Sequence, residues 1–284
     1  MSSISPVRNA ARATIPLRSR PRRLIEGFAF FAVWVGLGYL LPVGAETYLL
    51  LGIPLTVLFQ VAVRRRPLRE LWVRHPAPRS RLVRRDLAVT GLLALAPAYW
   101  GLQVIGGGNP AVIGWYVAAV LGAAAAAYAL GFTSVRGMLR TAAPATVVGV
   151  VGNVLVIGAV HMATSTSIDV VATVGSVLKW LVIYFPATFV IEEVAFRGAL
   201  DSHVHRPGDG RGWHSALFVS VLWGLWHLPV TDGPPLPLLV GSLIGWHCLV
   251  GIPLSLAWRR SGNLAGPAFA HSATDAVRNG LLGL

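Results

Sequence analysis

The chain has 284 residues, of which 55% are apolar and only 12% are charged, and its mean hydropathy is +0.64. These values exclude an ordinary soluble domain and predict a polytopic helical membrane protein. The net charge of +13 does not predict nucleic-acid binding, because the basic residues gather in short segments between apolar runs. Cys248 is the only cysteine, which excludes an internal disulfide and a cysteine-based zinc site.

The first segment, residues 1–23, is rich in Arg, Ser and Pro and contains no acid, so we predict a disordered basic cytoplasmic tail. Nine apolar runs follow, and their length is typical of membrane-spanning helices. The last run is short enough to end within the bilayer. The predicted fold is therefore an all-α bundle of about eight or nine transmembrane helices. The runs are, in chain order, about 24–43, 47–63, 87–105, 111–132, 142–163, 170–197, 214–230, 238–258 and 264–284.

The basic residues predict how these spans are oriented. If the N-terminus is cytoplasmic and the spans alternate, the segments on the inside hold 22 of the 24 Lys and Arg residues. The segment 64–86 has nine Arg and is expected to lie as a surface loop on acidic lipid headgroups. The Arg-dominated, Ala- and Gly-rich composition is typical of a high-GC bacterium. We therefore expect a multi-pass protein of a bacterial plasma membrane. The inside segments are 1–23, 64–86, 133–141, 197–213 and 259–263.

After the tail, we divide the chain into N-terminal transmembrane helices, 24–163, and a C-terminal catalytic core, 164–284. The first part holds few polar residues within its spans, and we expect Asn153 and His161 to make structural hydrogen bonds. Its small residues Ala123–Ala127 favour close helix packing. Chemistry is therefore expected in the second part.

The sixth span ends in two adjacent carboxylates, Glu192 and Glu193, followed by Arg197. An ionisable residue within a membrane costs on the order of 2.5–3.5 kcal/mol, so such residues indicate function. Residues four apart share a helix face, so Glu193 is expected to pair with Arg197 while Glu192 faces elsewhere. The alternative is a solvated helix end with Arg197 reaching the interface. Pro186 is expected to kink the helix near the site.

Further polar residues lie in the last three spans: His227, His247, His271 and Asp275. His271 and Asp275 are four residues apart and share a helix face, which would let the carboxylate orient the imidazole. His203 and His205 are read as solvated loop residues. Two carboxylates and several histidines in neighbouring spans favour a catalytic or proton-transfer site over simple packing.

The motifs Glu192-Glu193-x-x-x-Arg197, an aromatic residue four before His227, and His271-x-x-x-Asp275 resemble those of the CPBP family. These are intramembrane endopeptidases, also called CAAX prenyl endopeptidases or the Abi family. The resemblance covers about residues 185–280. The family usually has Phe four residues before the histidine, where this chain has Trp223.

The resemblance implies an enzyme that hydrolyses a peptide bond of a membrane-associated substrate. Glu192 would activate a water held by His227, and His271 with a protonated Asp275 would bind the oxyanion. Glu193 and Arg197 would support them. No cofactor is certain: the resemblance allows a divalent metal such as zinc, with Glu192, His227 and His271 as candidate ligands. The sequence contains no HExxH motif and leaves direct water activation and a metal both open.

The depths of two site residues set a geometric requirement. Counted from the predicted cytoplasmic ends, Glu192 is about 5–8 residues deep and His227 about 13, a difference of roughly 8–12 Å. The seventh span must start above the bilayer, tilt or kink for the two to meet. Arg197 and the pair Arg259-Arg260 lie near the site, so we expect it to open toward the cytoplasm.

Two other functions are compatible with these residues. Intramembrane Glu and His also form proton relays, so a proton-coupled transporter is one alternative. The other is a non-catalytic membrane scaffold or immunity protein. The expected partners are a membrane-associated peptide or protein and the lipid bilayer, with no nucleic acid.

Overall fold

The structure is a computed structural model that describes residues 19–74, 83–210 and 212–284. Over these residues the chain is helical without a β-strand, and one isolated antiparallel bridge joins Val73 to Asn263. This confirms the predicted all-α class. Residues 1–18 of the predicted tail and 75–82 of the Arg-rich loop lie outside the described residues.

The helices follow the predicted spans closely. In chain order they are α1 (Arg20–Leu40), α2 (Ala45–Leu58) with its π-helical continuation η1 (Phe59–Arg64), η2 (Leu68–Leu71), α3 (Arg84–Ile105), α4 (Pro110–Leu130), α5 (Val135–Thr164), α6 (Val170–Thr188) with its π-helical continuation η3 (Phe189–Asp201) and α7 (Ser202–Val204), η4 (Pro207–Asp209), α8 (Trp213–Trp226), η5 (Leu228–Val230), α9 (Leu236–Ser261) and α10 (Ala265–Leu281).

Seven helices of the described chain are long and apolar enough to cross a membrane, which confirms a polytopic membrane protein. The helices at the predicted seventh and ninth spans, α8 and α10, have only 14 and 17 residues. A full crossing needs about 20 residues. The number of eight or nine spans and the cytoplasmic N-terminus therefore stay predictions.

Two predicted boundaries are wrong. The first helix begins at Arg20, so the end of the predicted tail is helical, and Arg23 is buried and donates to the Val204 carbonyl oxygen over 3.1 Å. The sixth helix does not end at Arg197 but continues to Val204. Both predicted boundaries fall at Arg residues, Arg23 and Arg197, whose side chains are buried in the structure.

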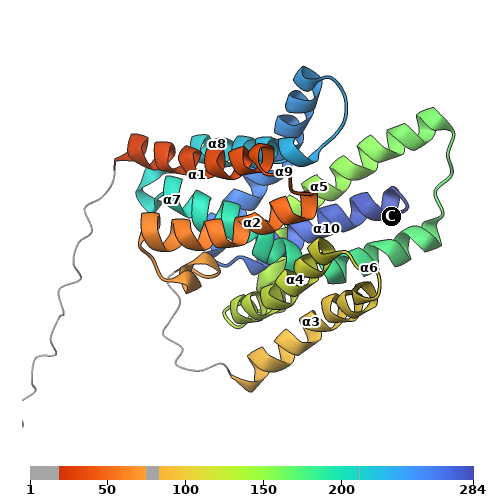
Figure 1. Cartoon of the computed structure of the whole chain (residues 1–284), viewed down its shortest axis with the longest axis horizontal. Helices are drawn as coiled ribbons and strands as arrows, with labels where there is room; N and C mark the ends of the chain where they lie inside the picture. The colour runs from red at the N-terminus through yellow and green to blue at the C-terminus, as the bar shows by residue number, and fades with distance from the viewer. Residues whose placement is uncertain (1–18, 75–82, 211) are drawn as a thin grey trace, which may run out of the picture.

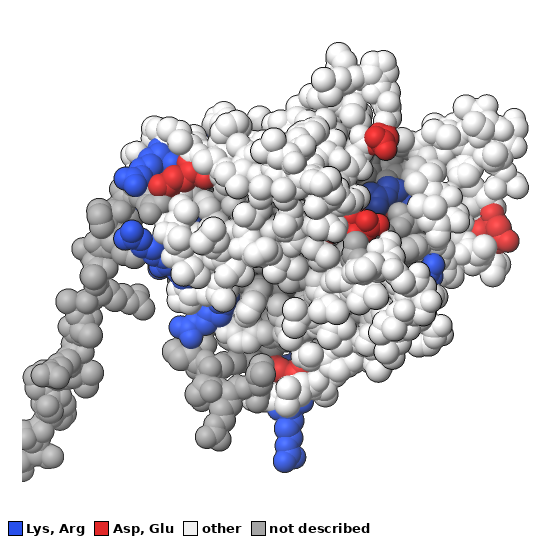
Figure 2. Space-filling model, viewed as in Figure 1, with Lys and Arg blue, Asp and Glu red and all other residues white. Residues whose placement is uncertain are grey.

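Most helices lie side by side along the long axis of the molecule, and α9 begins in turns that rise away from the end of α5 (Figure 1). Lys and Arg side chains on the face in view gather mainly at the left end, near the first turn of α1 (Figure 2). We call this the basic end. It contains the described parts of the Arg-rich segments, including Arg64, Arg74 and Arg259.

The Arg-rich loop lies on the surface only in part, because residues 65–69 are exposed whereas the following residues pack against the bundle. Leu71 and Val73 are buried, and Trp72 and Arg74 form backbone hydrogen bonds with Leu264 and Gly262. Arg64 donates to the Gly198 carbonyl oxygen over 2.9 Å. These contacts dock the loop onto the end of the sixth helix and the start of α10.

The buried core runs through both predicted parts of the chain. Trp34 of α1 packs against Trp226 of α8 and Phe196 of η3, with ring centroids 4.8 and 6.0 Å apart. Small residues bring helices close, and a side chain at Gly122 of α4 would overlap the Pro186 carbonyl oxygen. The N-terminal helices therefore help to shape the region around the sixth helix.

Candidate active site

The paired carboxylates lie on η3, the π-helical continuation of α6 that starts three residues after Pro186. Helical irregularities of this kind are frequent at functional sites. Glu193 accepts a hydrogen bond from Arg197 over 2.8 Å, and both side chains are fully buried. The predicted ion pair is confirmed, and the alternative of a solvated helix end is wrong for these two residues.

Glu192 turns to the other side of the helix and lines a cavity. Its Oε2 accepts a hydrogen bond of 2.8 Å from the indole Nε1 of Trp223. The same indole ring lies against Arg197, whose guanidinium carbon is 4.1 Å from the ring centroid. Trp223 thus contacts Glu192 directly and Glu193 through Arg197. The sequence identified it only as an aromatic replacement for Phe, but Phe has no group that could donate this hydrogen bond.

His271 joins α10 to both carboxylates. Its Nδ1 lies 2.9 Å from Glu193 Oε1, and its Nε2 lies 3.3 Å from Asp275 Oδ2 and 3.9 Å from Glu192 Oε2. The predicted pairing of His271 with Asp275 is confirmed. The second oxygen of Asp275 is 3.2 Å from Arg278 Nη1.

His227 follows the last turn of α8. Its Nδ1 is 3.0 Å from the Trp223 carbonyl oxygen. A carbonyl can only accept, so Nδ1 carries the proton and Nε2 of the neutral ring keeps its lone pair. The preceding carbonyl, that of Trp226, accepts a hydrogen bond of 2.7 Å from the Tyr48 hydroxyl. A residue of α2 therefore helps to place His227.

His247 also lines this cavity, although the sequence named it only among the polar residues of the last three spans and assigned it no role. Its ring centroid lies 4.3 Å from that of His227 and 4.5 Å from that of Trp223. The only sequence signal was a further histidine in a neighbouring span. No spacing along the chain links it to the others, because the contacts join α8 to α9.

The predicted difference in depth between Glu192 and His227 disappears in the structure. The sixth helix continues to Val204, so Glu192 is about 12 residues from its basic end. His227 is about 14 residues from Trp213, the start of α8. At 1.5 Å per residue both lie roughly 18–21 Å from the basic end.

The candidate residues meet around one cavity of about 940 Å³ inside the bundle. This volume is within the range of about 300–1,000 Å³ that is usual for ligand sites. Four of the six predicted site residues line it, namely Glu192, His227, His271 and Asp275. Trp223, the aromatic residue of the second motif, lines it as well, whereas the buried Glu193–Arg197 pair does not. Asn153 also contributes to the wall, and its amide donates to the Thr274 carbonyl oxygen over 2.7 Å, the structural role that we predicted.

The cavity does not extend in the direction that we expected. Its described walls run from Glu192 and His271 toward Ala45, Thr231 and Leu282, which are at the ends of helices opposite the basic end. Glu192 and His271 form its floor. The basic end is the one predicted to be cytoplasmic, so the predicted orientation and the predicted opening toward the cytoplasm do not agree with each other for this cavity.

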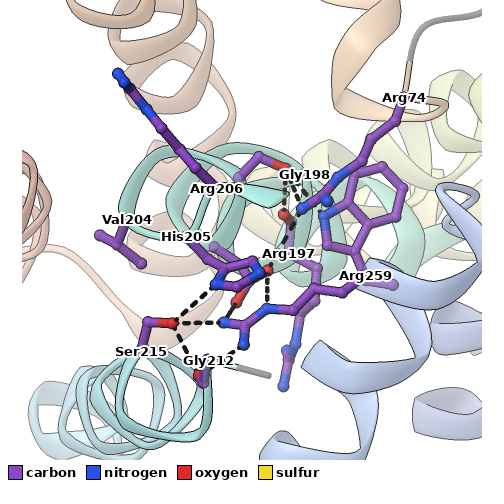
Figure 3. Close-up of polar contacts among 12 residues, drawn as sticks. Arg74, Arg197, Gly198, Val204, His205, Arg206, Gly212, Ser215 and Arg259 are labelled. Atoms are coloured by element: carbon purple, nitrogen blue, oxygen red, sulfur yellow. Dashed lines mark hydrogen bonds and ion pairs between the residues drawn. The ribbon is translucent and has the colours of Figure 1, made fainter. Parts of the chain in front are cut away.

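A polar cluster that includes Arg74 and Arg259 lies at the basic end (Figure 3). Asp201 at the end of η3 is fully buried and accepts a hydrogen bond of 3.0 Å from Arg259, with Arg74 at 3.7 Å. Arg259 also donates to the Gly212 carbonyl oxygen over 2.8 Å. His205 is buried beside Ser215 in this cluster (Figure 3), so its predicted role as a solvated loop histidine is wrong.

The structure does not gather ligands for a metal ion. Among the described residues, no three His, Cys, Asp or Glu side chains are placed to hold one. Both ring nitrogens of His271 already face carboxylates. The suggested zinc site at Glu192, His227 and His271 does not fit this arrangement, and zinc dependence stays an untested prediction.

These observations define a multi-pass helical membrane protein that holds carboxylates and histidines around an internal cavity. Residues 173–277 match the family model of the type II CAAX prenyl endopeptidase, Rce1-like. The matched segment contains every predicted site residue, and it confirms the resemblance to the CPBP family. It supports an intramembrane CAAX protease acting on a membrane-associated substrate. Neither a curated protein nor a solved structure matches the chain.

Proposed function

We propose that the protein is an intramembrane endopeptidase that hydrolyses a peptide bond with a water activated by Glu192. The observation that carries this proposal is that Glu192, His227 and His271 line one cavity inside the bundle, with Glu192 and His271 3.9 Å apart. Peptide hydrolysis needs a base for the water and a donor for the oxyanion within reach of the same carbonyl carbon.

Glu192 and His227 hold the water. One oxygen of Glu192 is engaged by Trp223, and its Oε1 has no hydrogen-bond partner among the described residues. This oxygen takes a proton from the water, and the lone pair on His227 Nε2 accepts the second hydrogen bond. The oxygen of the water then attacks the peptide carbonyl, and the proton on Glu192 passes to the leaving amine.

His271 stabilises the oxyanion. With carboxylates at both ring nitrogens, a doubly protonated imidazolium satisfies each partner. Its Nε2 hydrogen, which faces Asp275 and lies beside Glu192, can be shared with the negative oxygen that forms during attack. Asp275 is held by Arg278 and acts here as an acceptor that orients His271, in place of the donor role that the resemblance implied.

Glu193 and Arg197 form the support of this arrangement. Glu193 Oε1 contacts both Arg197 and His271, so one oxygen fixes the position of the imidazole and is itself fixed by the guanidinium. Because these three side chains are buried, their geometry is set by the protein rather than by solvent.

The test is a Glu192→Gln variant, compared with Asp232→Asn as a control at an exposed position. Loss of a general base should reduce the rate about 10²–10⁴-fold, whereas the control should cleave as the unchanged protein does. Cleavage would be measured with quenched fluorescent peptides, with and without a lipid anchor, in proteoliposomes. Equal rates for the Gln variant and the unchanged protein would refute the role of Glu192.

A further inference from the structure

The cavity is built from one half of each helix that lines it. On α9 its lining residues run from Ser242 to Val250, far from the basic pair Arg259-Arg260. On α10 they run from His271 to Leu282, away from the helix start at the basic end. On the sixth helix they stop at Glu192.

Between the floor of the cavity and the basic end, the described residues of η3 and α9 include fully buried side chains. Arg197, Asp201 and Trp258 have no exposed surface, and they lie between the floor of the cavity and the basic end. The hydrogen bonds of the cluster in Figure 3 tie this region together across η3, α8 and α9. A peptide coming from the basic end would have to displace these contacts.

The opposite end is open. Ala45, Ser242 and Leu282 line the cavity and are exposed. Here the first turns of α9 and the last turns of α5 point apart (Figure 1), and the surface is hollowed between their projecting ends (Figure 2). We call this opening the distal mouth.

We propose that the substrate reaches Glu192 and His271 through the distal mouth. By the positive-inside rule the basic end is cytoplasmic, so the substrate is a peptide segment at the non-cytoplasmic face of the membrane. That a substrate enters here rests on the proposed function, whereas the position of the distal mouth does not.

The depth of the cavity restricts the shape of this peptide. Leu282 and His271 are 11 residues apart on α10, or roughly 16 Å along the helix axis. An extended chain spans about 3.3 Å per residue, so about five residues must enter to bring a peptide bond to the floor. The substrate is therefore an extended chain end or an unfolded segment, and a folded surface loop would not reach.

Thiol labelling in membrane vesicles tests the access route without any need for catalysis. Cys248 is the only cysteine, so Cys248→Ala gives a background free of thiols. Ser242→Cys and Ser261→Cys then mark the two ends of α9, 19 residues or roughly 28 Å apart. Thr188→Cys places a thiol inside the cavity, one turn from Glu192.

A charged, membrane-impermeant thiol reagent would be added to sealed right-side-out and inverted vesicles. We expect Ser261→Cys to react only in inverted vesicles, and Ser242→Cys and Thr188→Cys only in right-side-out vesicles. Labelling after denaturation shows that each thiol is present. Ile157→Cys, on the α5 wall of the same cavity, repeats the measurement if the Thr188 variant fails to fold.

Reaction of the cavity thiol from the Ser261 side would overturn the proposal, as would its failure to react while Ser242→Cys reacts. A reversed pattern at all positions would keep the distal mouth but refute the assigned side of the substrate.

Cleavage of a soluble quenched peptide, added outside each type of vesicle, separates the two proposals. Cleavage only in inverted vesicles refutes the access route and retains the protease. The expected labelling without cleavage of any peptide refutes the protease and retains the distal mouth.

Discussion

Trp223 touches the groups on which the proposed chemistry depends. It donates to Glu192, stacks on Arg197 and lies with its ring centroid 4.9 Å from that of His271. Its carbonyl also holds His227 through Nδ1. A single side chain and its own backbone thus orient the base, the ion pair and both histidines.

Replacing Trp223 with Phe removes the indole N–H that donates to Glu192 but keeps an aromatic ring. The ring would still cover Arg197, but Glu192 would lose a donor, and a hydrogen bond to a charged group contributes about 1.5–3 kcal/mol. We expect kcat/KM to fall at least about 10-fold, with little change in the melting temperature. Trp213→Phe, at an exposed position, is the matched control, and an unchanged kcat/KM for Trp223→Phe would remove this role.

At the scale of helices, α4 determines where η3 can lie. Gly122 of α4 faces Pro186 and Val190 so closely that a Cβ atom would overlap the Pro186 carbonyl oxygen. The site residues begin only two residues after Val190. The position of the paired carboxylates therefore depends on a glycine in a helix that carries no family motif.

We expect Gly122→Ala to destabilise the protein by about 1–3 kcal/mol, the usual effect of overpacking. It should also lower the cleavage rate, because η3 must shift. Gly175→Ala on α6 has open space around it and should stabilise by up to about 1 kcal/mol. Thermal unfolding in detergent measures both, and equal melting temperatures for the two variants would contradict the close packing.

Local spacing along a helix was sufficient to predict some pairs. Glu193 with Arg197, and His271 with Asp275, are each four residues apart, and a helix alone brings them together. The contact of Trp223 with Glu192 and the stacking of His247 on His227 join different helices. Neither follows from a repeat distance, so the sequence could not predict them.

The packing of the whole molecule also decides features that a hydropathy pattern cannot. The apolar runs predict α8 and α10, and the short last run predicts a short α10, but the runs do not predict that α8 has only 14 residues or that both helices are largely buried. Basic residues predict one charged end, but not that Asp201 and Trp258 are fully buried near it. The direction of the cavity is therefore a property of the assembled bundle.

The stability of the whole molecule should depend on pH through His205, which lies at the basic end outside the spans. Burial lowers the pKa of His205 below its usual value, and the nearby Arg259 guanidinium lowers it further. Asp201 opposes this shift, Arg74 adds to it, and Asp209 opposes it least. The folded state then resists protonation, while the unfolded chain binds a proton below about pH 6.5. Stability is thus full above this pH and falls as the pH drops below it.

We expect His205→Gln to lose less stability than the unchanged protein between pH 7.5 and 5.5, as measured by denaturant unfolding at each pH. Comparing the two proteins isolates His205 from the other titrating groups. Parallel pH profiles would show that His205 is protonated as easily in the folded as in the unfolded chain.

The hydrogen bond from Tyr48 to the Trp226 carbonyl has a consequence for how such proteins diverge. The helix that supplies Tyr48 lies outside the segment that matches the family model, yet it holds the backbone one residue before His227. A chimera that joined the first helices of one relative to the last helices of another would therefore inherit every motif and still misplace a histidine. A chain can therefore carry all the motif residues and still lack the contacts from outside the motifs that place their side chains.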